Sequence, residues 1–259
     1  MTILHAPSTG VPAAPRTSSR DGGVDLVRAV CVVGVVLLHA IMVGVTVGDA
    51  GPVFANASDG AWWIVQVSWL LQVMPLFFVI GGFSGSIALR RSRERGGDGI
   101  RFTAERLHRL LRPALVTVSV VGILLAVLER CGVPAELVAT AGYRFGQPLW
   151  FLGVFLLCQA LLPVMLRLHE RHPLVTVSML AGAAVLVDGV RAATGAGGVG
   201  FANLVFVWLV LQQVGFFLAD GRIDALGRRT RSVVLVMAVL ALVGSFVLGV
   251  HSPDLIANI

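Results

Sequence analysis

The stretch VDLVRAVCVVGVVLLHAIMVGV, residues 24–45, decides the fold. Its ionisable residues are Asp25, Arg28 and His39, and the rest is almost wholly apolar. A helix of this length crosses the roughly 30 Å hydrocarbon core of a bilayer, because each residue rises about 1.5 Å. Backbone groups in hydrocarbon must be bonded internally, and the stretch lacks the strict alternation of a barrel strand. It therefore predicts a transmembrane helix.

Six further apolar runs of comparable length follow the first along the chain. The seven runs are residues 24–47, 62–89, 110–128, 149–166, 175–190, 201–219 and 233–250. The composition agrees, because 56% of the 259 residues are hydrophobic and only 13% are charged, whereas a soluble domain carries about 25% charged residues. We therefore predict an all-α fold, a polytopic transmembrane bundle of about seven spanning helices. Soluble enzymes and disulfide scaffolds are excluded.

The two ends of the chain differ from this apolar body. Residues 1–23 are rich in Ser, Pro, Gly and Ala, a composition typical of a disordered lead rather than a signal peptide. Residues 24–259 are expected to form one transmembrane domain. The sequence stops at Ile259 without a polar tail, so we expect the bundle to continue in a longer protein.

The 20 basic residues, all arginine, are distributed unevenly between the loops. Most precede the first run or lie between the second and third, the fourth and fifth, and the sixth and seventh runs, whereas the other loops hold Arg130, Arg144 and Arg191. Because positive residues are retained on the cytoplasmic side, we expect a cytoplasmic N-terminus and a multi-pass protein of the plasma membrane. The same rule accounts for the net charge of +6, so no nucleic-acid partner is expected.

The ionisable residues of the first run are functional candidates, because such a group in hydrocarbon costs about 2.5–3.5 kcal/mol. Asp25 and Arg28 are three residues apart and can pair on one helix face. His39 follows Arg28 by eleven residues, which places it within about 20° of the same face and about 16 Å deeper. Arg28 either reaches the cytoplasmic headgroups or binds an anionic ligand. His39 either bonds a neighbouring helix or acts as a general base.

The segment RLHRLLRP, residues 106–113, leads into the third run. Arg106, Arg109 and Arg112 recur every three residues, so they form one ridge on a helix. Arginine binds phosphate through paired donors. The ridge therefore suits either a phosphorylated ligand or anionic lipid headgroups.

Small residues interrupt the second run in VMPLFFVIGGFSGS, residues 73–86. The glycines Gly81, Gly82 and Gly85 favour close packing against another helix. They also leave room for a slender ligand, and the sequence alone keeps both interpretations open.

Polar residues near the ends of two later runs have less specific meanings. Asp188 lies three residues before Arg191, so it either pairs with that arginine or orients a histidine or an acceptor sugar. His169 and His172 are interpreted as solvated loop histidines, because no cysteine accompanies them and Glu170 is the single carboxylate nearby. No metal site is predicted.

Four of these segments occur in an order that resembles the membrane-bound acyltransferase family 3. They are the first run with Arg28 and His39, PLFFVIGGF (residues 75–83), RLHRLLRP, and QPLWFLGVFLL (residues 147–157). The resemblance covers nearly the whole chain from Asp21 onward. It implies a helical core with more spans than the seven counted here.

The resemblance implies transfer of an acyl group, usually acetyl, from cytoplasmic acyl-CoA to a hydroxyl of a carbohydrate or glycolipid acceptor. By the same resemblance, Arg28 and His39 are the expected catalytic residues. Arg106 and Arg109 are the residues expected to bind acyl-CoA. Acyl-CoA, the acceptor and membrane lipids are the expected partners, and no metal or other cofactor is implied.

Two other classes of function stay open at this point. A transporter could use His39 and Asp188 as a proton relay, and a helical bundle could serve interaction without catalysis. A requirement for acyl-CoA would distinguish the enzyme from both.

Overall fold

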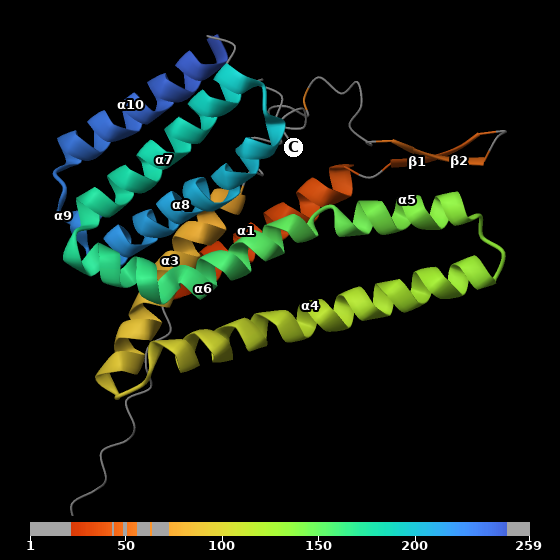
Figure 1. The fold of residues 1–259 in the computed structure, drawn as a ribbon, viewed down its shortest axis with the longest axis horizontal. Helices are drawn as coiled ribbons and strands as arrows, with labels where there is room; N and C mark the ends of the chain where they lie inside the picture. The colour runs from red at the N-terminus through yellow and green to blue at the C-terminus, as the bar shows by residue number, and fades with distance from the viewer. Residues whose placement is uncertain (1–21, 43, 49–50, 56–62, 64–72, 248–259) are drawn as a thin grey trace, which may run out of the picture.

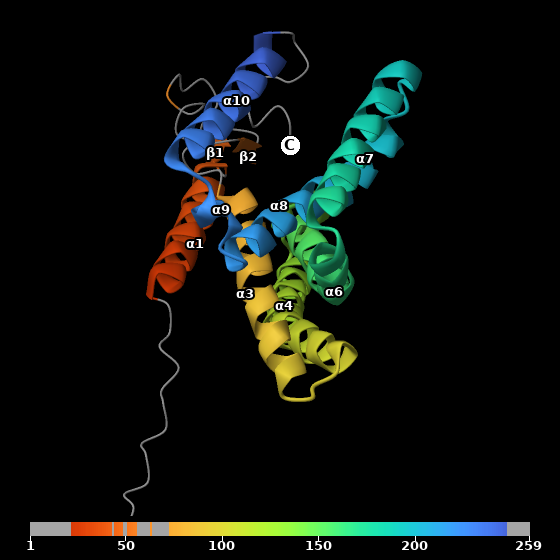
Figure 2. The same ribbon diagram turned by 90° about the vertical axis from the view of Figure 1, so that its left-hand side faces the viewer.

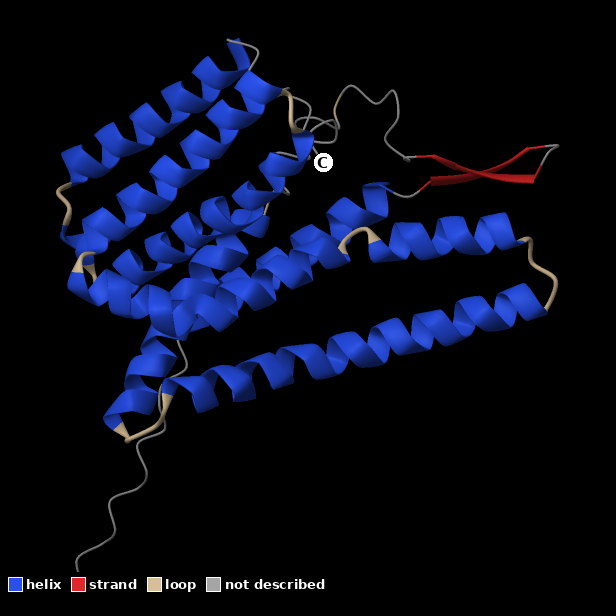
Figure 3. Cartoon of the chain, viewed as in Figure 1, coloured by secondary structure: helices blue, strands red, loops and turns tan. Residues whose placement is uncertain are grey.

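The computed structural model describes residues 22–42, 44–48, 51–55, 63 and 73–247, and this part of the chain is almost entirely helical (Figure 1; Figure 3). Its helices are α1 (Gly22–Met42), α3 (Met74–Glu94), α4 (Gly99–Arg130), α5 (Ala135–Gly146), α6 (Leu149–Arg171), α7 (Pro173–Thr194), α8 (Asn203–Ala219), α9 (Arg222–Ala225) and α10 (Arg228–Val247). A 3₁₀ turn, η1 (Gly197–Ala202), precedes α8, and the strands β1 (Gly44–Gly48) and β2 (Gly51–Ala55) follow α1.

Each of the seven predicted apolar runs overlaps a described helix. Four described segments are long and apolar enough to cross a membrane, namely Gly99–Arg130, Ala135–Arg171, Pro173–Thr194 and Gly197–Ala219. The predicted helical class and the membrane helices are therefore confirmed, while the number of seven spans and the cytoplasmic N-terminus stay predictions. Outside the described residues lie 1–21, 64–72 and 248–259, which include most of the expected lead, part of the second run and the end at Ile259.

The first predicted span is too long at its C-terminal end. The helix ends at Met42, and Gly44–Gly48 forms a strand that pairs antiparallel with Gly51–Ala55. The physical reason lies in the sequence GVTVG, because glycine and β-branched residues are poor helix formers and Val and Thr favour strands. Val47 is 82% exposed on this hairpin, so burial in the described protein does not hold it in place.

Two further boundaries differ from the prediction. The third run was expected from residue 110, but α4 begins at Gly99 and is 32 residues long, so the basic ridge lies within the helix. The segment Ala135–Gly146, expected to be a loop, is the helix α5. Hydropathy locates only the most apolar part of a helix, so helical turns that carry charged residues fall outside the predicted runs.

Helices α3 and α8 cross in close contact (Figure 2). A Cβ atom on Gly82 would overlap the backbone oxygen of Gln212, and one on Gly215 would overlap the backbone oxygen of Val79. Only residues without a side chain allow two backbones to approach so closely. The expected role of the small residues in close helix packing is therefore confirmed.

Aromatic side chains join α3 to α6 and α8. Phe78 stacks on Trp208 with ring centroids 4.3 Å apart, and meets Phe151 and Phe155 edge-on, each at 5.5 Å. Offset stacking and edge contacts are the favourable arrangements of aromatic rings. These contacts fix α6 beside α3 and so position one wall of the cavity described next.

Candidate active site

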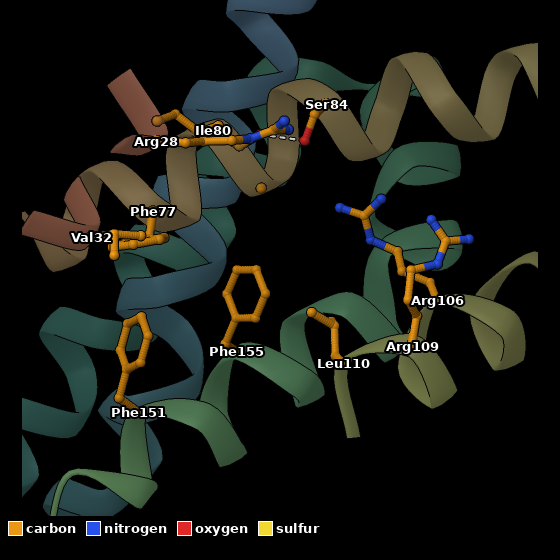
Figure 4. Close-up of a pocket in the computed structure, with 11 residues that line it drawn as sticks. Arg28, Val32, Phe77, Ile80, Ser84, Arg106, Arg109, Leu110, Phe151 and Phe155 are labelled. Carbon is orange, nitrogen blue, oxygen red and sulfur yellow. Dashed lines mark hydrogen bonds between the residues drawn. The ribbon is translucent and has the colours of Figure 1, made fainter. Parts of the chain in front are cut away.

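A cavity of about 420 Å³ lies between α1, α3, α4 and α6 (Figure 4). Its lining residues are Arg28, Val32, Phe77, Ile80, Gly81, Ser84, Arg106, Arg109, Leu110, Phe151 and Phe155. Three of the four predicted site residues thus meet around one space, although 78 residues of sequence separate Arg28 from Arg106. The rest of the lining is apolar apart from Ser84.

Arg28 lines the cavity from α1. Its Nη1 lies 3.3 Å from Oδ1 of Asp25, so the ion pair expected from their spacing is confirmed. Both side chains are about half exposed, at 44% and 47%, and a pair in such surroundings contributes little to stability. Asp25 therefore restrains Arg28 at the cavity without burying it.

Arg106 and Arg109 line the cavity from α4, where their spacing of three places both on one face (Figure 4). Arg106 is half-buried, and its Nε donates a 2.7 Å hydrogen bond to Oε1 of Gln159 on α6. Arg109 is exposed. The third member of the predicted ridge, Arg112, is not among the lining residues.

His39 is not among the residues that line this cavity. It is half-buried near the C-terminal end of α1, two turns beyond Val32 on the same face and about 16 Å from Arg28 along the helix. Its Nδ1 lies 2.8 Å from the carbonyl oxygen of Val35. A carbonyl only accepts hydrogen bonds, so Nδ1 carries a proton, and in the neutral ring Nε2 holds the free lone pair. His39 thus has the tautomer of a base that acts through Nε2.

The apolar wall of the cavity is built of phenylalanine rings. Phe151 meets Phe77 edge-on at 5.9 Å and stacks with Phe155 at 6.2 Å, with 17° between the planes. An aromatic wall facing charged groups excludes water and strengthens electrostatic interactions at the boundary. The cavity thus combines cations on one side with apolar rings on the other.

The sequence interpretation missed Gln159, Gln212 and Gln213, which are fully or almost fully buried. Gln159 accepts from Arg106, and Gln212 donates from Nε2 to the backbone oxygen of Cys158 at 2.8 Å. A lone amide within an apolar helix requires a hydrogen-bond partner on a neighbouring helix. That signal was present in FLLCQALL and VLQQVGF, although it does not identify the partner.

The interpretation of His169 as a solvated loop residue is wrong. His169 lies on α6 and is fully buried, with Nδ1 2.7 Å from Oε1 of Gln213 and Nε2 3.2 Å from Oδ2 of Asp220. Asp220 also accepts from Nη1 of Arg90 at 2.7 Å. Burial raises the pKa of Asp220, but the hydrogen bonds and positive charge of Arg90 and His169 outweigh it and hold that pKa below its usual range.

Asp188 has a different partner from the one expected. Its Oδ1 accepts a 2.8 Å hydrogen bond from Nδ2 of Asn203, and the ion pairs of the described residues do not include one with Arg191. Helix α7, which carries Asp188, and helix α1, which carries His39, lie apart in both ribbon views (Figure 1; Figure 2). The two ends of the suggested proton relay are therefore not brought together.

Comparison with known proteins gives one match. The family model described as "Acyltransferase domain" matches residues 21–257, which is most of the chain. No curated protein and no solved structure matches this sequence.

Proposed function

The chain belongs to the membrane-bound acyltransferase family 3 and is an acyltransferase, and we propose that it moves an acetyl group from cytoplasmic acyl-CoA to a hydroxyl of a carbohydrate or glycolipid acceptor. One observation carries the proposal. Arg28 meets Arg106 and Arg109 around a single cavity whose other walls are largely apolar. A ligand suited to that cavity has anionic groups at one end and a slender uncharged arm at the other, as acyl-CoA does.

Arg106 and Arg109 are the proposed phosphate-binding residues. A guanidinium donates paired hydrogen bonds to phosphate oxygens. Among the described residues, neither arginine takes part in an ion pair with a carboxylate. Their charge is therefore available to an anionic ligand, whereas Arg90 and Arg93 are paired with Asp220 and Glu170.

His39 is the proposed general base, acting through Nε2. It takes the proton of the acceptor hydroxyl while the hydroxyl oxygen attacks the thioester carbonyl carbon. When the carbon–sulfur bond breaks, the CoA thiolate leaves and receives the proton held by His39. The proposed role of Arg28 is to guide the thioester arm from the phosphate-binding end of the cavity toward His39. The separation of about 16 Å between Arg28 and His39 along α1 is spanned by the extended arm of the donor.

The proposed topology follows the arginine distribution. With the N-terminus in the cytoplasm, the cavity arginines face the compartment that holds acyl-CoA, and His39 lies deeper in the bilayer. The acceptor then approaches from the opposite side of the plasma membrane. No metal is needed for this chemistry, and membrane lipids surround the bundle.

The experiment is a transfer assay with radiolabelled acetyl-CoA and purified protein in detergent. We expect His39→Ala to lower the transfer rate by about 100-fold or more, the usual contribution of general acid–base catalysis. The matched control is His108→Ala, which removes an exposed histidine of α4 that does not line the cavity. Transfer at the parental rate by both His39→Ala and Arg28→Ala would refute the proposed mechanism.

A further inference from the structure

Arg106 differs in the chemistry of its partner from the described arginines that form ion pairs. Arg28, Arg90, Arg93, Arg101 and Arg222 each contact a carboxylate, with nearest distances from 2.7 to 3.5 Å. Arg106 instead contacts a neutral amide, that of Gln159, which is 2% exposed. The difference matters because a carboxylate cancels the charge of a guanidinium, whereas an amide oxygen only orients it.

The bond is made to one nitrogen of the guanidinium. Gln159 Oε1 accepts from Nε of Arg106 at 2.7 Å, so both terminal Nη groups keep their donors. Paired binding of a phosphate is available through these two Nη groups. Arg109 lines the same cavity and takes part in no ion pair among the described residues, so it adds a second uncompensated positive charge at this end.

Two glycines of α3 make room for the pair. A Cβ atom on Gly81 would lie 3.1 Å from Nε2 of Gln159 and 3.0 Å from Cε2 of Phe155. A Cβ atom on Gly85 would overlap Leu162 and lie 3.6 Å from Nη2 of Arg106. The surface of α3 therefore supports both the amide and the guanidinium, and packing fixes their orientation.

We propose that Gln159 is a positioning residue that orients Arg106 toward the phosphate groups of the donor and, because it is neutral, leaves the charge of Arg106 uncompensated. This inference rests on the proposed function of the cavity. Through Gln159, helix α6 contributes to the affinity for the donor, and this contribution depends entirely on Arg106.

Gln159→Glu tests the inference most sharply. Glutamate has the same length and keeps an acceptor for Nε, so the contact between α4 and α6 is retained while the charge of Arg106 is neutralised. We expect the KM for acetyl-CoA to rise about tenfold, the effect of weakening one charge-assisted hydrogen bond. We expect kcat to stay within about twofold and the thermal midpoint to be no lower than that of the parent. Gln159→Leu removes the acceptor and is expected to raise KM as well.

A double-mutant cycle shows whether the residue acts through Arg106. In an Arg106→Ala background, Gln159→Glu is expected to cause no further rise in KM. An unchanged KM for Gln159→Glu, or a rise that persists in the Arg106→Ala background, would overturn the inference while the parent still transfers acetyl groups. A parent that does not consume acetyl-CoA would instead overturn the proposed function and this inference together.

Discussion

Gly82→Ala is predicted to loosen the contact between α3 and α8. A Cβ atom at this position would overlap the backbone oxygen of Gln212 and lie 3.1 Å from its carbonyl carbon. Backbone atoms cannot rotate away as a side chain does, so the two helices must separate. Overpacking costs about 1–3 kcal/mol, and the stacking of Phe78 on Trp208 between the same helices weakens as they part. We therefore expect a loss of about 3 kcal/mol, near the upper end of that range.

Gly153→Ala is the matched control, because Gly153 lies in α6 and its Cβ would meet no atom within 4 Å. Alanine exceeds glycine in helix stability by about 1 kcal/mol, so this variant is expected to be as stable as the parent or more stable. The assay is the temperature at which half of the detergent-purified protein loses its monodisperse peak. With about 2–4 °C per kcal/mol for a chain of this size, we expect Gly82→Ala to lose roughly 6–12 °C. Equal midpoints for the two variants would refute the argument from backbone contact.

Three other variants follow from the site and its surroundings. Phe155→Ala removes part of the apolar wall of the cavity and is expected to raise the KM for acetyl-CoA about tenfold, because the proposed donor arm loses an apolar contact; an unchanged KM would exclude this wall as a binding surface for the arm. Arg109→Ala is expected to raise the KM for acetyl-CoA about tenfold, whereas Arg112→Ala, on the same helix but outside the cavity, is expected to leave the KM unchanged. An equal rise in KM for both variants would show that these arginines attract the donor only through their general positive charge. Asp220→Asn is expected to lower the thermal midpoint at neutral pH. Because the folded-state pKa of Asp220 is depressed, its contribution is present above the unfolded pKa of about 4 and disappears as pH falls further; a difference from the parent that does not change with pH would contradict this.

The sequence predicted the helices well, because length and hydropathy suffice to locate a membrane helix. It also singled out Arg28 and His39 as catalytic candidates and Arg106 and Arg109 as donor-binding candidates, and three of the four, Arg28, Arg106 and Arg109, lie around one cavity. What it could not supply was rotation about each helix axis. Gln159 faces Arg106 because α4 and α6 pack with a particular rotation about their axes. The local sequence pattern of either helix does not predict that rotation.

The errors have local and long-range causes. The hairpin that follows α1 begins at Gly44, where backbone preference ends a helix that hydropathy alone would continue to residue 47. The wrong interpretation of His169 has a long-range cause. Its neighbours in sequence are basic and polar, but its partners Gln213 and Asp220 come from α8 and the residue that follows it. Contacts across more than forty residues of chain are not visible in a hydropathy pattern.

The hydrogen bond between His39 and Val35 has a consequence for the reaction cycle. Since Nδ1 keeps its proton whether the ring is neutral or charged, the imidazole need not turn over between accepting a proton and returning it. Proton uptake and release then occur at the same atom, facing the same direction, in both halves of the proposed turnover. The backbone carbonyl of Val35 therefore makes a reorientation of the His39 side chain unnecessary in each cycle.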